Sequence, residues 1–168
     1  IAFYDIENGM AVAEIGAGTG MFSLLLGLAY DSLTIYMNDI ALNSMNFAYD
    51  RVNRCKSIRR TNKYFAVEGK KKSTKLEDYQ VDRVIVRNAF HHFSNKEKML
   101  ASIKLSMTPS TELCLFEPDK SSEGPGTCPR AMKADALKKV LKDNGLQIIE
   151  EHRVEKWGWV LIRCKLMP

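Results

Sequence analysis

Three glycines alternate with other residues in one short turn, and an acidic side chain follows at a defined distance. Gly16, Gly18 and Gly20 stand between an apolar run and a helical pattern, and Asp39 comes 19 residues after Gly20. Glycine has no side chain, so such a turn permits positive φ angles and a close approach of ligand to backbone. A carboxylate at the end of the next strand can accept hydrogen bonds from both hydroxyls of a ribose. The pattern therefore predicts a nucleoside site.

Two details narrow the class of nucleoside cofactor. A dinucleotide fingerprint would place its third glycine at position 21, which is Met21 in this chain. Glu14 lies two residues before Gly16, and its carboxylate would repel a pyrophosphate. The Gly-Lys-Ser/Thr ending of a phosphate-binding loop is also absent from the turn. These residues favour S-adenosylmethionine, which carries an ammonium, a sulfonium and no phosphate, over a nicotinamide dinucleotide.

Two adjacent histidines are candidates for acid–base chemistry. His91 and His92 follow the apolar strand predicted over residues 82–88. Histidine titrates near neutral pH, so it can serve as a general base when an acceptor must lose a proton. We take His91 as the candidate catalytic base. The alternative is that its side chain caps the following helix or packs against it.

The elements that must position these residues alternate along the chain. Strands are predicted over residues 11–15, 32–40, 63–68, 82–88, 112–117, 146–155 and 157–166, and helices over 21–30, 41–54, 94–107 and 131–144. Ser94 and Glu97 have the spacing of a capping box, and Gly145 stands where a left-handed residue would end a helix. Strands separated by helices form a mostly parallel sheet, here with an antiparallel terminal hairpin. The fold class is α/β, doubly wound.

Length and composition indicate one globular domain over residues 1–168. Hydrophobic residues make up 45% of the chain and charged residues 27%. No stretch approaches the roughly 18 consecutive apolar residues of a membrane-spanning helix. The four cysteines are far apart and include no Cys-x-x-Cys pair (Cys55, Cys114, Cys128 and Cys164). We therefore expect no disulfide framework, no metal site and a cytoplasmic location.

Positive charge is concentrated between Arg51 and Lys75. This window holds ten basic residues and one acidic residue, a net charge of +9, whereas the rest of the chain has a net charge of −4. Such a segment can attract nucleic acid or another acidic macromolecule. The favoured interpretation is a solvated surface, because no stacking aromatic residues are interspersed among the lysines.

Four segments, taken together, resemble a known family. They are, in chain order, GMAVAEIGAGTGMFS (9–23), IYMNDI (35–40), VDRV with NAFHHF (81–84 and 88–93) and LCLFEP (113–118). In their order and spacing they resemble the small-molecule-type branch of the class I S-adenosylmethionine-dependent methyltransferases. The turn Asn144-Gly145-Leu146 matches the entry to that family's final hairpin. The resemblance implies a Rossmann-like sheet of seven strands with an antiparallel C-terminal strand.

The resemblance also implies which residues bind the cofactor. The glycine turn would pack its backbone against S-adenosylmethionine, and it comprises Gly16, Ala17, Gly18, Thr19 and Gly20. Glu14 would hold the amino-acid end of the cofactor, directly or through water, and Asp39 would hold the ribose hydroxyls. Ile40 would lie beside the adenine, and Asn88 would lie under the methionine moiety.

The chain departs from the family pattern in three places, and one is the turn Pro109-Ser110-Thr111 before the fifth strand, where relatives usually have Pro-Gly-Gly. In many relatives an acidic residue follows the glycine of the third motif and helps to hold the adenine, but Lys70 follows Gly69 here. Either Glu68 replaces that acid or the backbone alone holds the adenine. Relatives also carry one or two helices before the first motif, whereas eleven residues precede Val12. We therefore expect the N-terminal lid segment to be short or missing.

The methyl acceptor is predicted to be a small molecule. Methyltransferases that act on adenine or on glutamine amides share an Asn/Asp-Pro-Pro-aromatic motif, and residues 88–91 read Asn-Ala-Phe-His without either proline. Two alternatives stay open. The basic segment 51–75 could recruit RNA or another acidic macromolecule as acceptor. The short N-terminus would also suit a non-catalytic, cofactor-binding subunit that acts by holding a partner.

Overall fold

The computed structural model describes residues 1–54, 61–121 and 128–168. Its strands are β1 (Ala11–Ile15), β2 (Thr34–Asp39), β3 (Lys63–Glu68), β4 (Val81–Arg87), β5 (Met107–Pro118), β6 (Leu146–Val154) and β7 (Trp159–Leu166). Its α-helices are α1 (Met21–Ala29), α2 (Asn46–Arg54), α3 (Lys96–Lys104) and α4 (Ala134–Asp143). Short 3₁₀ turns are η1 (Ala2–Tyr4), η2 (Leu42–Met45), η3 (Phe90–His92) and η4 (Glu155–Trp157). Within the described ranges, no helix is long and apolar enough to cross a membrane.

The described strands form one seven-stranded sheet in the order β3-β2-β1-β4-β5-β7-β6. β1 to β5 run parallel, and β7 is antiparallel to both of its neighbours, β5 and β6. The chain leaves β1 on one side toward β2 and β3 and returns on the other side at β4, which makes this boundary the switch point of the sheet. The prediction of a Rossmann-like, doubly wound sheet with an antiparallel C-terminal strand is confirmed.

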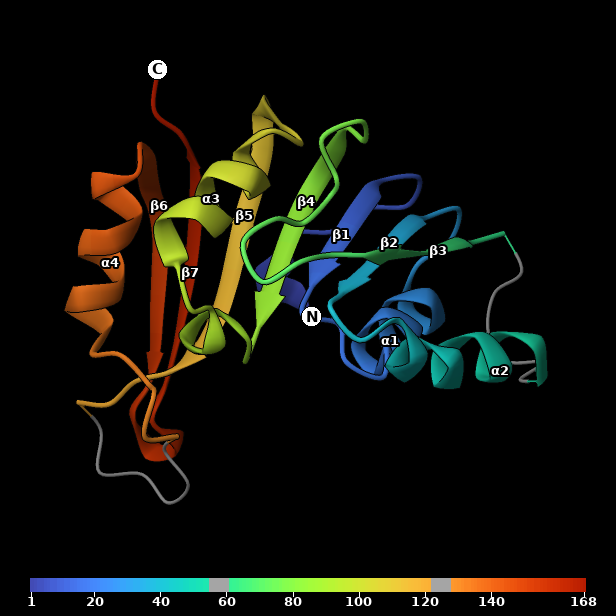
Figure 1. Cartoon of the computed structure of the whole chain (residues 1–168), viewed down its shortest axis with the longest axis horizontal. Coiled ribbons are helices and arrows are strands. Elements are labelled where there is room, and N and C mark those ends of the chain that lie inside the picture. The colour runs from blue at the N-terminus through green and yellow to red at the C-terminus, as the bar shows by residue number, and fades with distance from the viewer. Residues whose placement is uncertain (55–60, 122–127) are drawn as a thin grey trace.

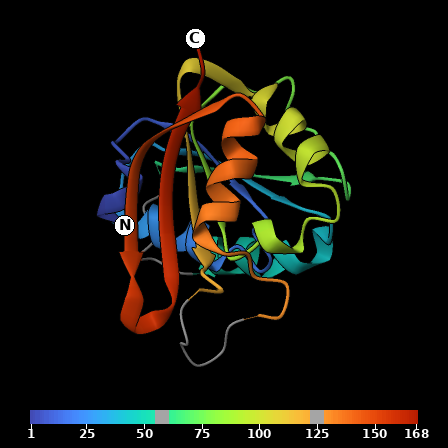
Figure 2. The same ribbon diagram turned by 90° about the vertical axis from the view of Figure 1, so that its left-hand side faces the viewer.

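Two hydrophobic layers cover the two faces of the sheet. Alternate residues of a strand point to opposite faces, and in β4 Val84 and Val86 pack into one layer whereas Ile85 packs into the other. The first layer contains side chains of α3 and α4, and the second contains side chains of η1 and α1 with Ala48 of α2. The views along and across the sheet show the helices divided in this way, with α4 lying over β6 and β7 (Figures 1 and 2).

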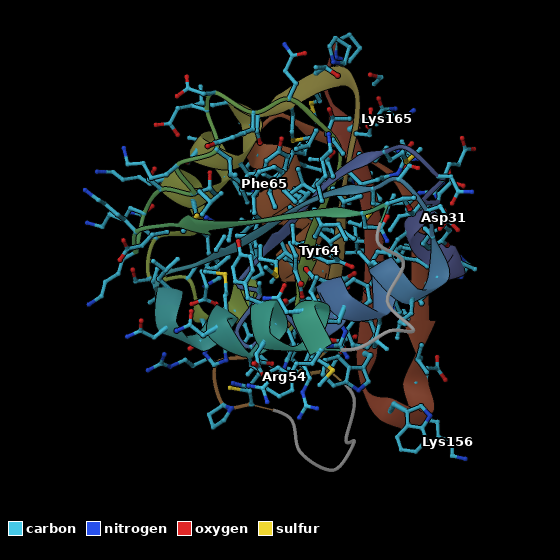
Figure 3. The ribbon with its side chains drawn as sticks, turned by 90° about the vertical axis from the view of Figure 1, so that its right-hand side faces the viewer. Asp31, Arg54, Tyr64, Phe65, Lys156 and Lys165 are labelled. Atoms are coloured by element: carbon cyan, nitrogen blue, oxygen red, sulfur yellow. The ribbon has the colours of Figure 1, made fainter. Side chains whose placement is uncertain are left out.

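The edge strand β3 follows the same alternation. Tyr64 and Phe65 lie on opposite sides of the strand (Figure 3). The Tyr64 hydroxyl stands where a Cβ on Gly27 of α1 would be, so the absent side chain of this glycine makes room for the ring. Phe65 stacks on Tyr36 of β2, with 5.5 Å between the ring centroids. β3 is thereby fastened on both faces, and it carries the lysine-containing loop that follows Glu68.

Several predicted boundaries differ from the structure, by one to five residues. The helix predicted over 41–54 begins as the 3₁₀ turn η2 before it continues as α2. The predicted capping box is wrong, because the N-cap of α3 is Asn95, whose Oδ1 accepts a hydrogen bond from the Lys98 N–H at 2.8 Å. The fifth strand, predicted over 112–117, begins at Met107, because Met107 pairs with Val81 across a register shift.

Candidate functional site

A cleft of about 470 Å³ lies at the carboxyl ends of β1, β2 and β4, beside the switch point of the sheet. Four of the predicted cofactor-binding residues line it, namely Gly16, Asp39, Ile40 and Asn88. The other predicted site residues do not line it, and these are Glu14, Ala17, Gly18, Thr19, Gly20, Glu68, Gly69 and His91. Four predicted residues therefore form part of the cleft wall, and residues 17–20 of the glycine turn follow Gly16 outside the lining.

The glycine turn uses the left-handed backbone that its composition predicts. Gly16, Gly18 and Gly20 have φ angles of 76°, 54° and 73°. A Cβ on Gly16 would stand 2.5 Å from the Cβ of Ala89, and one on Gly20 would stand 2.6 Å from the Cβ of Ala48. A Cβ on Gly18 would have nothing within 4 Å. The outer glycines are thus required by packing, whereas Gly18 faces open space.

Asp39 ties the glycine turn to the end of β2. Its Oδ2 accepts a hydrogen bond from the Gly18 N–H at 2.8 Å, and its Oδ1 accepts one from the Ala41 N–H at 2.9 Å. An ionised carboxylate has about four lone-pair sites, so two accepting positions remain. Asp39 is half-buried and lines the cleft, and the next residue, Ile40, lines it with 57% of its surface exposed. A polar acceptor and an exposed apolar side chain thus stand side by side.

Glu14 lies beneath the turn. Its Oε2 accepts two hydrogen bonds from Ser23 at the start of α1, one from the hydroxyl at 2.6 Å and one from the backbone N–H at 3.1 Å. Burial raises the pKa of this carboxyl from 4.5 to about 7, although the bonds from Ser23 and the charge of Arg87 oppose the rise. A cation placed beside Glu14 would favour its ionised form.

A buried asparagine organises the loop that follows β3. Asn38 Nδ2 donates to the carbonyls of Val67 at 2.9 Å and Thr74 at 2.7 Å. The Gly69 N–H donates to the Asp39 carbonyl at 2.9 Å, and a Cβ on Gly69 would lie 3.1 Å from Asn38 Nδ2. The loop therefore reaches the cleft through Lys70 and Lys71, which line it, whereas the Glu68 side chain does not. Residues 55–60 of the predicted basic segment lie outside the described ranges.

Asn88 follows β4 directly and has an uncommon backbone conformation. Its φ angle is +53°, in the left-handed region that asparagine tolerates better than most residues. Its N–H donates to the Phe116 carbonyl at 2.7 Å, which fastens this bend to β5. The bend exposes Asn88 at the cleft and turns the following chain into η3.

Glu117, at the end of β5, gathers the residues of η3 around one buried carboxylate. Its Oε1 accepts hydrogen bonds from the N–H groups of Ala89 and Phe90 at 2.8 and 2.9 Å. Its Oε2 accepts one from the His91 N–H at 3.2 Å and lies 2.6 Å from His91 Nδ1. Both side chains of the Glu117–His91 pair are 2% exposed. His91, the predicted base, is thus held inside the protein and away from the cleft.

His92 takes the place at the cleft that the sequence assigned to its neighbour. It is exposed and lines the cleft together with Arg130. Partial burial lowers its pKa below the usual value, and the neighbouring His91 and the charge of Arg130 act in the same direction. Sequence reasoning did not assign Glu117 to the site. A carboxylate at the carboxyl end of a strand adjoining β4 was the signal that could have identified it.

The model of the family described as methyltransferase domain matches residues 13–115. The matched span runs from β1 through most of β5 and includes the four predicted residues that line the cleft. No curated protein matches the sequence significantly.

Solved structures share the fold over almost the whole chain. A SAM-dependent methyltransferase from Aquifex aeolicus is similar with a TM-score of 0.79 and 20% identity, over 96% of this chain and 84% of that chain. The [4+2]-cyclase SpnF gives a TM-score of 0.78 and 14% identity, over 99% of this chain and 77% of that chain. The glycopeptide N-methyltransferase MtfA complexed with (S)-adenosyl-L-methionine gives a TM-score of 0.72 and 15% identity, over 97% of this chain and 88% of that chain. At these identities the likeness establishes the fold.

Proposed function

The chain belongs to the class I S-adenosylmethionine-dependent methyltransferases, and from this premise we propose that it methylates a small acidic molecule bound in the cleft. The observation that carries the proposal is the cleft wall itself, where the Asp39 carboxylate stands beside the exposed Ile40 and the glycine turn. The cleft volume of about 470 Å³ lies within the usual range of roughly 300–1,000 Å³ for small-ligand sites.

The residues present fit S-adenosylmethionine. Asp39 retains two accepting positions, which suits the two hydroxyls of a ribose. Ile40 offers an apolar surface for the adenine. Glu14, whose ionisation is held back by burial, would attract the ammonium of the methionine moiety, directly or through water. The backbone of the glycine turn and Asn88 would contact the remainder of the methionine moiety. The loop before Lys70 would hold the adenine without an acidic side chain.

The cofactor supplies the hard chemistry, because its sulfonium makes the transferred methyl group electrophilic. The protein then has to align the acceptor with that methyl group and exclude water. Apolar side chains of Ile15, Phe93 and Met99 line the cleft and suit the second task. If the acceptor must lose a proton, His92 at the cleft is better placed to receive it than the buried His91.

The charge of the cleft supports an acidic acceptor. Lys70, Lys71 and Arg130 line it, and Asp39 is the only acidic residue among the described residues that do so. These cations would attract and orient a small molecule that carries a carboxylate or phosphate.

RNA is the second candidate acceptor, because Lys70 and Lys71 belong to the basic segment 51–75 and also line the cleft. RNA binding that weakens steeply between about 50 and 200 mM salt would favour this acceptor. Cofactor binding without turnover on any acceptor, together with a stable partner, would instead favour the non-catalytic subunit.

Calorimetric titration with S-adenosylmethionine, S-adenosylhomocysteine and NAD tests the cofactor assignment directly. We expect the first two to bind and NAD not to bind. Asp39→Ala should weaken binding of S-adenosylmethionine by about 1–3 kcal/mol, as for loss of a hydrogen-bonded carboxylate. Asp143→Ala is the matched control, because Asp143 is exposed on α4 and pairs only with Lys139 among the described residues. Equal loss in both variants, or no binding by the folded wild-type chain, would contradict the proposal.

A further inference from the structure

Three side chains that can ligate a metal meet beside the cleft. One ligand atom each from His91, His92 and Cys128 can be chosen so that all three lie within 4.8 Å of one another. The histidines belong to η3 after β4, whereas Cys128 precedes α4. The His91 and His92 rings lie with their centroids 4.0 Å apart. The cluster therefore joins residues that are adjacent in sequence to one that is 36 positions away.

The first of these side chains is already oriented. His91 Nδ1 lies 2.6 Å from Glu117 Oε2, which leaves Nε2 as the free ring nitrogen. Glu117 is itself fixed by the N–H groups of Ala89, Phe90 and His91. A carboxylate on the far nitrogen of a histidine is the usual support behind a metal-ligating imidazole, because it sets the tautomer and raises the basicity of the ligand.

Hydrogen bonds fix the backbone of the turn that begins at Cys128. The Cys128 carbonyl accepts a hydrogen bond from the Ala131 N–H at 2.8 Å, which closes the turn. The carbonyl of Met132, the residue after Ala131, accepts a hydrogen bond from the Lys120 N–H at 3.0 Å, which fastens the turn to the chain that leaves β5. Cys128 is half-buried and is a free thiol.

We propose that His91, His92 and Cys128 bind one zinc ion, with Glu117 supporting His91 from behind. Two imidazoles and a thiolate are typical zinc ligands, and three protein ligands leave the fourth tetrahedral position to water or substrate. Ligand atoms of such a centre are about 3.3–3.6 Å apart, given zinc–nitrogen and zinc–sulfur bonds of roughly 2.0–2.3 Å. The ligand atoms here lie within 4.8 Å of one another. Rotation of the exposed His92 and the half-buried Cys128 side chains can bring them to zinc-binding separations while His91 stays fixed.

Charged groups of both signs surround the proposed zinc site. Arg130 and Lys96 both act on His92 electrostatically and oppose a cation there. The Cys128 thiolate and the Glu117 carboxylate would offset a dication. Because His92 also lines the cleft, a bound ion would sit at the wall of the cleft, and His92 as its ligand would then not serve as a base.

Zinc binding by the purified, metal-free chain tests this proposal without any use of the cofactor. Competition with a chromophoric chelator should give one zinc per chain. With Co²⁺ as probe, we expect the intense visible bands of a tetrahedral ion and an ultraviolet thiolate-to-cobalt band. Cys128→Ser and His92→Asn should each weaken zinc binding by more than about 100-fold, since loss of an outer-shell partner alone costs 10–100-fold.

Two further variants separate a built site from adventitious binding. His152→Asn should bind zinc like the wild type, because His152 is exposed on β6 and bonds to Glu150 outside the cluster. Glu117→Gln should weaken binding about 10–100-fold, and circular dichroism will show whether the chain remains folded. If Cys128→Ser retains the stoichiometry and affinity of the wild type, or if Co²⁺ gives no thiolate band, the site is not formed. Neither result would bear on binding of S-adenosylmethionine.

Discussion

Gly18 combines two demands at one residue, a left-handed backbone and an open approach for ligand. A Cβ there would meet no neighbour within 4 Å, but a valine would have to adopt a φ of +54°. We expect Gly18→Val to cost roughly 1–2 kcal/mol of stability for the left-handed conformation and to abolish binding of S-adenosylmethionine sterically. Circular dichroism and calorimetry measure the two effects separately.

Gly9 provides the matched control for this substitution. It also has a positive φ, +89°, and a Cβ there would likewise meet nothing within 4 Å. It lies before β1, and it does not line the cleft. Gly9→Val should therefore lower stability to a similar extent and leave cofactor affinity unchanged. Similar affinities for the two variants would show that Gly18 serves only the turn.

Glu14 makes the free energy of unfolding depend on pH. Its pKa is about 7 in the folded chain and near 4.5 when solvated, so the folded state binds the extra proton between these values. Stability contributed by the neutral form is present below about pH 4.5 and is lost as pH rises toward 7. The loss approaches about 3 kcal/mol for a shift of this size.

Glu14→Gln isolates this effect from every other titrating group. Urea unfolding of both proteins at pH 5 and at pH 8 should show the variant gaining stability relative to the wild type at the higher pH. A difference that is constant between the two pH values would mean that the carboxyl ionises normally inside the fold.

At the scale of elements, the start of α3 shows how a local pattern can mislead by one residue. Ser94 and Glu97 match a capping box, but Asn95 makes the cap bond to Lys98. Asn95→Ala should therefore lower the free energy of unfolding by about 1 kcal/mol, whereas Ser94→Ala should change it by a few tenths at most. Chemical denaturation of the two variants decides which residue caps the helix.

The strands that position the cleft could be predicted well because their signal is local. β1 and β3 coincide with their predicted ranges, and β2 and β4 begin or end within two residues of theirs. The early start of β5 was missed, because Pro109 and Ser110 argue for a turn while pairing of Met107 with Val81 extends the strand. Pairing with a strand far away in the sequence sets that boundary, so a pattern read over a few neighbouring residues does not predict it.

At the scale of the whole molecule, the predicted residues that line the cleft all stand at strand ends that meet at one edge of the sheet. Their meeting follows from the parallel order, which the alternation of strands and helices predicts. The cluster of Cys128 with His91 and His92 was not predicted, and the cysteine spacing indicated no metal site. Its members meet through the packing of η3 against Glu117 and through the turn after residue 127. Neither feature produces a periodic pattern of hydrophobic residues that could be recognised in the sequence.

The place of β7 between β5 and β6 has a consequence for synthesis of the chain. β5 pairs with β4 on one side, and on the other side with a strand that is translated more than 40 residues later. Until β7 emerges from the ribosome, the edge of β5 has free N–H and C=O groups, and the side chains that β7 covers are exposed. The nascent protein therefore passes through a state with an open central strand, which is the kind of surface that chaperones protect from aggregation.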